Sequence, residues 1–192
     1  MAKKEAKVIE LHAMDIQIMS ITLVGDSSLV CHKWADKAKK MMLDKQMGKA
    51  VKGKKEPKNP EQDYKDSLYQ HPEGGYGFPA VAFKSAAVDA CSQVDGLTKV
   101  QARGSFHVVG DLVKIVGKPA MREDMVRVGM GTADIRYRGE FKTWKCTLTI
   151  RYNARSLSAE RILNLFNIAG FAVGVGEHRP QKNGSWGMFH VE

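Results

Sequence analysis

The chain has 192 residues, with 30 Lys and Arg against 21 Asp and Glu, so its formal charge is +9. Because 43% of the residues are hydrophobic and 27% are charged, the chain is neither disordered nor fibrous, and its length suits one domain, 1–192, with a sizeable core. No apolar run approaches the roughly 20 residues that span a bilayer, and no stretch of signal-peptide type follows the first residues. We therefore expect a cytoplasmic protein with no membrane partner.

The positive charge is concentrated in one segment. Between Lys33 and Lys58 there are ten lysines and three acidic residues, which accounts for seven of the nine surplus charges and leaves two for the other 166 residues. Clustered cations displace counterions from phosphates, so a polyanion is the natural partner of this segment. A solvated, highly charged loop would show the same composition, and charge alone leaves both interpretations open.

The first elements are a strand and a basic helix. Alternating residues from Val8 to Val24 predict one long strand whose phase changes once, at a possible bulge. From Lys33 to Ala50 an apolar stripe that includes Trp34 recurs at helical spacing, and we expect it to pack against the body of the protein, with a motif for a partner helix as the alternative. Residues 51–61 contain two prolines and predict an exposed loop. We interpret 32–76 as a basic insertion that stands off the core.

The middle of the chain predicts a central helix and a hairpin. Pro79 suits a helix start, and apolar residues at i, i+3, i+4 and i+7 continue to about Gly96, where glycine can close the helix. Residues 105–109 and 112–116 then alternate on either side of Gly110-Asp111, which predicts a two-residue hairpin.

The last third predicts a strand, a helix and a glycine-rich tail. Residues 144–152 alternate apolar and polar more regularly than any other stretch, which predicts a strand with one core face. Ser158 caps a helix that Gly170 closes. An apolar stretch, 171–176, then predicts a further strand before the tail.

Without the insertion, the order of elements is βαβ-β-αβ, which indicates an α+β fold of the ferredoxin-like, split βαβ kind. Two helices would cover one face of an antiparallel sheet. The open sheet face, or the loops at its edge, would be free for a ligand.

Two arginine-containing regions follow the lysine segment. All nine arginines occur at or after Arg103, whereas the dense lysines precede it. Lysine is a mobile point charge and arginine a planar fork that holds a phosphate bidentately, so we expect an arginine groove and a flexible lysine clamp. Alternatively, Arg122 and Arg127 pair with neighbouring acidic residues.

In the tail, glycines at 174 and 176 either expose main-chain amides to phosphates, with Trp186 stacking on a base, or relieve strain in a tight turn.

This tail resembles the glycine-rich loop of the RAMP superfamily, the RNA-binding proteins of CRISPR effector complexes and their relatives. The resemblance covers the loop, the order of elements and the large basic insertion after the first strand, which is similar to the thumb of the subunit that coats guide RNA. It implies an RNA-binding protein, and a small phage protein is one possible source. Some members carry an acidic residue after the first strand that assists RNA cleavage, and Asp26 or Asp36 stands at that place here.

No other chemistry stands out. The histidines lack an HExxH spacing, no nucleophile elbow or P-loop occurs, and Cys31, Cys91 and Cys146 form no paired motif. The three cysteines suit buried hydrophobic positions better than a disulfide or zinc site. We therefore identify no metal, no cofactor and no small-molecule substrate.

We predict a nucleic-acid-binding protein without catalytic activity, which holds the phosphate backbone of single-stranded RNA or DNA and assembles as a homo-oligomer along it. Alternatives are an interaction protein of phage origin that mimics or inhibits a host CRISPR-type complex, and a RAMP-type ribonuclease that uses Asp26 or Asp36. Trp34 and Tyr137 are further stacking candidates. The residues expected to contact nucleic acid are Lys37, Lys40, Lys45, Lys49, Lys52, Lys54, Lys55, Lys58, Arg122, Arg127, Arg136, Arg138, Gly174, Gly176, His178, Arg179, Lys182 and Trp186.

Overall fold

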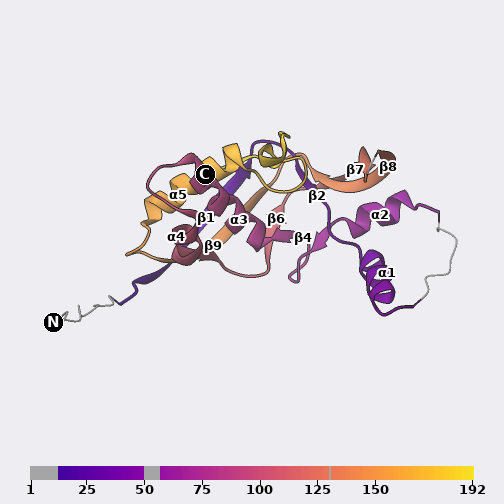
Figure 1. Cartoon of the computed structure of the whole chain (residues 1–192). Helices are drawn as coiled ribbons and strands as arrows, with labels where there is room; N and C mark the ends of the chain where they lie inside the picture. Colours follow the sequence, from indigo (N-terminus) through magenta and orange to yellow (C-terminus); the bar gives the residue numbers. More distant parts are fainter. Residues whose placement is uncertain (1–12, 50–56, 130) are drawn as a thin grey trace, which may run out of the picture.

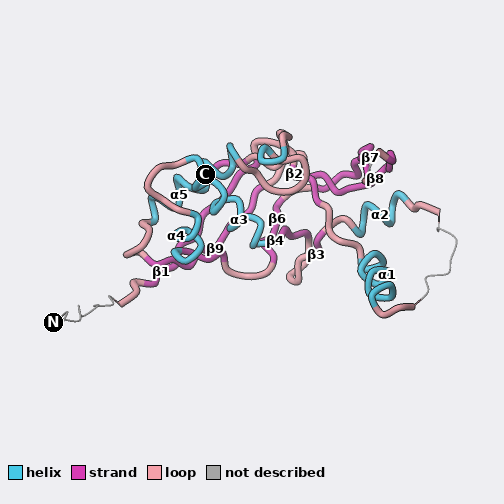
Figure 2. The backbone as a smooth tube through the Cα atoms, in the orientation of Figure 1, coloured by secondary structure: helices cyan, strands magenta, loops and turns pink. Residues whose placement is uncertain are grey.

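Two antiparallel sheets organise the computed structural model, which describes residues 13–49, 57–129 and 131–192 (Figures 1 and 2). Among these residues, seven strands form the larger sheet: β1 (Ile16–Gly25), β3 (Tyr69–Gln70), β4 (Tyr76–Pro79), β5 (Phe106–Val108), β6 (Leu112–Val116), β9 (Lys145–Asn153) and β10 (Phe189–Val191). The smaller sheet contains β2 (Leu29–Cys31), β7 (Pro119–Val128) and β8 (Thr132–Phe141). The predicted α+β class with antiparallel sheets is confirmed.

The centre of the larger sheet is the pair β1 and β9. Residues of β9 alternate between exposed and buried, so that Cys146, Leu148, Ile150 and Tyr152 face the core as the sequence pattern predicts. The pairing with β1 runs without interruption from Ile16 opposite Asn153 to Val24 opposite Lys145. The expected bulge is therefore absent from the described part of this strand. The predicted strand residues 8–12 lie outside the described residues.

The phase change in β1 has a different meaning. Ile21 and Leu23 are buried, whereas Ile18 remains 68% exposed on the other face of the sheet. Apolar residues alternate along both parts of the strand, but only those that follow the phase change, such as Ile21 and Leu23, face the helices.

Two long helices, α3 (Ala80–Ala90) and α5 (Ala159–Ala172), pack against each other on the core face. Phe83 of α3 meets Trp144 and Phe189, with ring centroids 6.5 and 6.1 Å apart. Pro79 and Ser158 precede these helices as predicted, and the Ser158 hydroxyl accepts a hydrogen bond from the backbone N–H of Arg161. Helix α3 directly follows β4 and precedes β5, α5 connects β9 to β10, and β10 lies beside β1.

The ends of both helices differ from the prediction. After α3 the chain makes a short 3-10 turn (Cys91–Gln93) and then a helix that the sequence analysis missed, α4 (Lys99–Ser105), which begins with a capping box between Thr98 and Gln101. Helix α5 continues through Gly170, where any Cβ would collide with the carbonyl of Phe189 in β10. This glycine permits close packing of helix on strand and does not end the helix.

The predicted hairpin at Gly110-Asp111 is wrong. Strands β5 and β6 do not pair with each other; both pair with β9, with His107 opposite Arg151 and Ile115 opposite Cys146. They lie end to end along β9, and the Gly-Asp turn connects the end of β5 to the start of β6.

The long hairpin of β7 and β8 was not predicted as strands. Its pairing extends from Pro119 opposite Phe141 to Val128 opposite Thr132, and β2 adds to the other edge of β8. Charged residues interrupt the apolar alternation here, so the sequence shows a set of basic residues without a clear strand pattern.

The segment 32–76 contains α1 (Asp36–Gln46), α2 (Pro60–Asp66) and β3. In Figure 1, α1 and α2 lie to one side of the larger sheet, close to the β7–β8 hairpin. Pro60, predicted within an exposed loop, is the first residue of α2, and the Asn59 side chain caps this helix by accepting from the N–H of Gln62. Helix α2 packs on β8, while α1 buries none of its residues.

Candidate functional site

A groove of about 430 Å³ is lined by the start of α1, the end of α2 and strand β8, and we call it the α1–β8 groove. The backbone N–H of Lys33 donates to the carbonyl of Ser67, and the N–H of Gly139 donates to the Ser67 hydroxyl, which joins the end of α2 to the segment before α1 and to β8. Trp34 and Tyr137, both expected to stack on bases, line this groove, and the Trp34 side chain is 51% exposed. The fold thus brings together two aromatic residues that are distant in sequence.

Charges of both signs line the α1–β8 groove. Lys58 pairs with Asp134 and donates to the carbonyl of Ile135, while Arg136 approaches the same carboxylate at 3.6 Å. The hydrogen bond from Lys58 holds the pKa of Asp134 below its usual value, and the nearby charges of Lys58 and Arg136 act in the same direction. Lys33 and two aspartates of α2 also line the groove. No sequence pattern marks these three residues as a site, because only the packing of α2 against β8 brings them together.

Helix α1 carries the predicted lysines on an exposed surface. Lys37, Lys40 and Lys45 are exposed, and Lys49, just beyond the helix, lies 3.7 Å from Asp44. The apolar stripe was expected to pack against the body, and this is wrong: Met41 and Met42 are 51% and 48% exposed. Lys52, Lys54 and Lys55 lie outside the described residues.

Arg138 and His32 connect this groove to the rest of the protein. Arg138 is 3% exposed, and its guanidinium lies 3.4 Å from Asp124 and 3.6 Å from Glu177, while its Nε donates to Nδ1 of His32 at 3.0 Å. Partial burial, and then the charge of Arg138, lower the pKa of His32. Since arginine can only donate, His32 accepts at Nδ1 and the neutral ring carries its proton on Nε2.

Arg122 stacks on Trp186. Its guanidinium carbon lies 3.9 Å from the ring centroid, and His178 meets the same indole edge-on with centroids 4.9 Å apart. Arg122 also donates to Asp124 at 2.8 Å and to Glu140 at 3.1 Å. The alternative of pairing with acidic neighbours therefore describes Arg122, whereas Arg127 is exposed near the tip of the hairpin.

The glycine-rich tail follows helix α5 directly, and the strand expected at 171–176 is absent from this described part of the chain. The backbone N–H groups of Val175, Glu177 and Gly187 donate to carbonyls of the same chain, on Gly187, Val30 and Ser28. Gly187 has φ +66°, and a Cβ there would collide with the Val175 carbonyl. These glycines let the tail pack closely on β2, as the turn interpretation of the sequence proposed.

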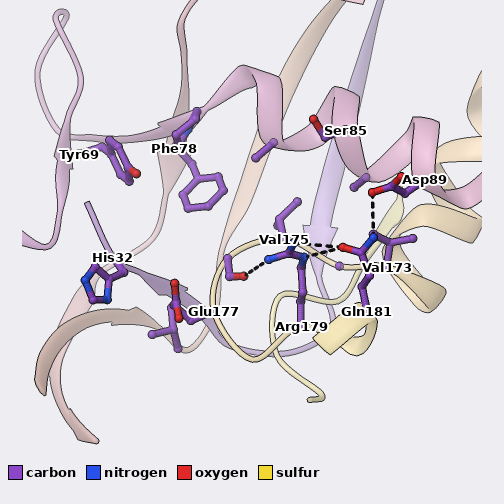
Figure 3. A pocket seen from close by; sticks show the side chains of 16 residues that line it. His32, Tyr69, Phe78, Ser85, Asp89, Val173, Val175, Glu177, Arg179 and Gln181 are labelled. Carbon is purple, nitrogen blue, oxygen red and sulfur yellow. Dashed lines mark hydrogen bonds between the residues drawn. The ribbon is translucent and has the colours of Figure 1, made fainter. Parts of the chain in front are cut away.

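A second cleft, of about 260 Å³, lies between this tail and α3 (Figure 3). Arg179 lines it and donates to the carbonyl of Gly176 and to the side chain of Gln181, which in turn donates to Asp89. Gly174, with φ +69°, is part of the same wall, while Lys182 is exposed in the following 3-10 turn (Pro180–Lys182). His32 borders this cleft as well as the α1–β8 groove.

The two aspartates named for catalysis lie in different surroundings. Asp26, after β1, is 2.6 Å from Nδ1 of His190 in β10, and both side chains are about half exposed. Asp36 is the first residue of α1, and its hydrogen bond from Lys39 lowers its pKa.

No group of three His, Cys, Asp or Glu side chains could hold a metal ion within the described residues. No helix in that part of the chain is long and apolar enough to cross a membrane.

Searches of protein families and of curated proteins return no match. Among solved structures, the chain is similar to Cmr6 from Pyrococcus furiosus, with a TM-score of 0.48 and 9% identity over 94% of this chain and 100% of that one. It is also similar to a chain of the Type III-B Cmr-beta complex bound to cognate target RNA, with a TM-score of 0.53 and 10% identity over 92% of this chain. The match spans 59% of that longer chain. The second comparison shows a shared fold.

Proposed function

We propose that the protein binds single-stranded nucleic acid through the exposed lysines of α1 and the adjoining α1–β8 groove, without catalysing a reaction on it. The observation that carries this proposal is the position of uncovered lysines beside a groove lined by two aromatic side chains. Cations attract the phosphate backbone, and aromatic rings stack on unpaired bases, which are the two contacts that single strands offer. The fold shared with a chain of an RNA-bound CRISPR complex supports the same ligand class.

Within this proposal, the expected residues take different roles. Lys37, Lys40, Lys45 and Arg127 are exposed and are assigned to the phosphates. Arg138 is buried among carboxylates, so we assign it to positioning the hairpin and the tail. The glycines of the tail likewise position Trp186 and His178. The segment 32–76 acts as a thumb-like clamp, and several copies assemble side by side along one strand.

The test is the salt dependence of binding. Each phosphate contact on a single strand contributes about −0.7 to the slope of log K against log salt concentration, so replacing Lys37, Lys40 and Lys45 by Ala is expected to make that slope shallower by about 2. A control that replaces Arg103, Arg155 and Arg161 by Ala removes the same charge from exposed positions in and around α4 and α5. Equal slopes for the two triple variants, or no binding of single-stranded RNA or DNA at low salt, would overturn the proposal.

The assembly state is measured on the same protein and strands. Sizing chromatography with absorbance at 260 and 280 nm reports bound nucleic acid and particle size together. Particles that lengthen with the strand support side-by-side assembly. A stoichiometric protein partner and no nucleic acid would instead favour the interaction-protein alternative.

One observation favours a second function, cleavage of RNA. The exposed Asp26 and His190 form a carboxylate–imidazole pair of the kind that moves a proton in general acid–base catalysis. If the protein is a ribonuclease, labelled RNA will be cleaved by the unaltered chain and not by the Asp26→Asn and His190→Gln variants. Intact RNA in all three incubations, together with binding, leaves the non-catalytic proposal as the description of the protein.

A further inference from the structure

The α1–β8 groove carries groups that a phosphate would not use. Lys58 and Arg136 are both engaged by Asp134, so only part of their charge is available to an anion. Asp63 and Asp66 of α2 line the same wall, and carboxylates repel phosphate but accept hydrogen bonds from N–H groups. Aromatic rings and carboxylates together suit the base of a nucleotide better than its backbone.

We propose that this groove holds one unpaired base of the bound strand, stacked on Trp34 and hydrogen-bonded through its N–H groups to Asp66, and that it therefore selects guanine over uracil. This inference rests on the proposed function and names a specificity that the phosphate contacts lack. The groove's volume of about 430 Å³ falls within the range of about 300–1,000 Å³ typical of small-ligand sites. It is large enough for a base with its sugar.

Asp66 is suited to reading a base because it is held in place. Its Oδ1 accepts a hydrogen bond from Nε2 of Gln62 at 2.8 Å, one helical turn earlier, and the side chain is partly buried. Each carboxylate oxygen has two acceptor sites, so this contact leaves acceptors on both oxygens. Partial burial strengthens any hydrogen bond that a ligand then makes to the carboxylate.

The pairing chemistry decides which base is preferred. Guanine presents two adjacent donors, N1–H and N2–H, which a carboxylate accepts together, whereas uracil presents one N–H between two carbonyl oxygens that the carboxylate repels. The Nε2–H of His32 and the ammonium of Lys33, which line the same groove, supply donors for the guanine carbonyl. Two-point recognition of a base edge discriminates by roughly tenfold or more.

The experiment compares strands of equal length and charge. A uridine tract, the same tract with guanosine at every third position, and the same tract with inosine there are titrated onto the full chain at one salt concentration. We expect the guanosine strand to bind about tenfold more tightly than the uridine tract, with the inosine strand, which lacks the N2 amino group, in between. Asp66→Asn should remove most of the difference, and Asp95→Asn, an exposed turn residue beside a different cavity, should preserve it.

A second readout follows the stack directly. Trp144 is buried and Arg122 lies over the ring of the partly buried Trp186, so most quenching of tryptophan fluorescence by guanosine monophosphate should be lost in Trp34→Phe or Trp34→Ala. Quenching by the free nucleotide would show that the groove binds a nucleotide whether or not it belongs to a strand. Quenching only by the guanosine strand would assign the groove to a base held by its own strand.

The two proposals fail in different ways. If all three strands bind with equal affinity and with the salt dependence described above, the base-selecting groove is wrong and the backbone-binding function stands. If no strand binds, both are wrong. Unchanged preference in Asp66→Asn and in Trp34→Ala would place the selectivity elsewhere and overturn the inference.

Discussion

The two basic regions of this protein hold their positive charges in opposite ways. On α1 the lysines are exposed, and the helix buries none of its residues. In the β7–β8 hairpin, Arg122 and Arg138 lie among Asp124, Glu140 and Glu177, and Arg138 is almost fully buried. The same formal charge is therefore exposed to solvent in one region and enclosed among carboxylates in the other. A count of cations along the sequence does not distinguish these roles.

The strongest test of the comparison is Arg138→Ala. It leaves Asp124 and Glu177 without this partner and removes the donor to His32, so we expect the free energy of unfolding to fall by about 3–5 kcal/mol. Urea denaturation followed by circular dichroism measures the change. Arg127→Ala, at an exposed position in the same strand, should stay within about 0.5 kcal/mol of the unaltered protein. Similar losses in the two variants would contradict the structural role of Arg138.

A smaller effect is expected from Arg122→Lys. Lysine keeps the charge but cannot lie flat on Trp186 while donating to both Asp124 and Glu140, so the free energy of unfolding should fall by about 1–2 kcal/mol. The emission spectrum of Trp186 should shift as its ring becomes more exposed. A variant as stable as the unaltered chain, with an unchanged spectrum, would show that the stack contributes nothing.

The smallest effect concerns pH and His32. Its pKa in the folded protein is lowered from 6.5, so the unfolded chain binds the proton more readily and stability is lost as the pH falls through about 6.5 and below. His32→Gln should therefore lose less stability than the unaltered chain between pH 7.5 and pH 5.5. Parallel pH profiles of the two proteins would exclude a contribution from His32.

The elements that the sequence predicts well are those with one strong periodic signal. The alternation in β9, the apolar spacing in α3 and the Ser158 cap of α5 each depend on neighbours in the chain, and the structure confirms them. The β7–β8 hairpin escaped prediction because its alternating positions carry paired charges, which satisfy each other across the strands. The turn at Gly110-Asp111 misled because turn residues report a change of direction and not which strand pairs next.

Some features of the candidate site can likewise be predicted from the sequence, and others cannot. The concentration of lysines in 33–58, the position of Trp34 beside them and the glycines of the tail are visible in the sequence. The presence of Tyr137, Trp34 and the carboxylates of α2 in one groove and the stack of Arg122 on Trp186 are not, because each joins residues far apart along the chain.

By itself the sequence determined the mixed α+β class, the main helices and strands of the core and the location of the surplus charge, because these follow from periodicity and composition. Only the tertiary structure decided which cations are exposed and which are buried. Burial and pairing are properties of neighbours in space: packing encloses Arg138 among carboxylates, while α1, whose apolar stripe was expected to be covered, leaves its lysines and methionines exposed. The sequence places most of the surplus charge in 33–58, and the structure shows that the described lysines of α1 in this segment are exposed.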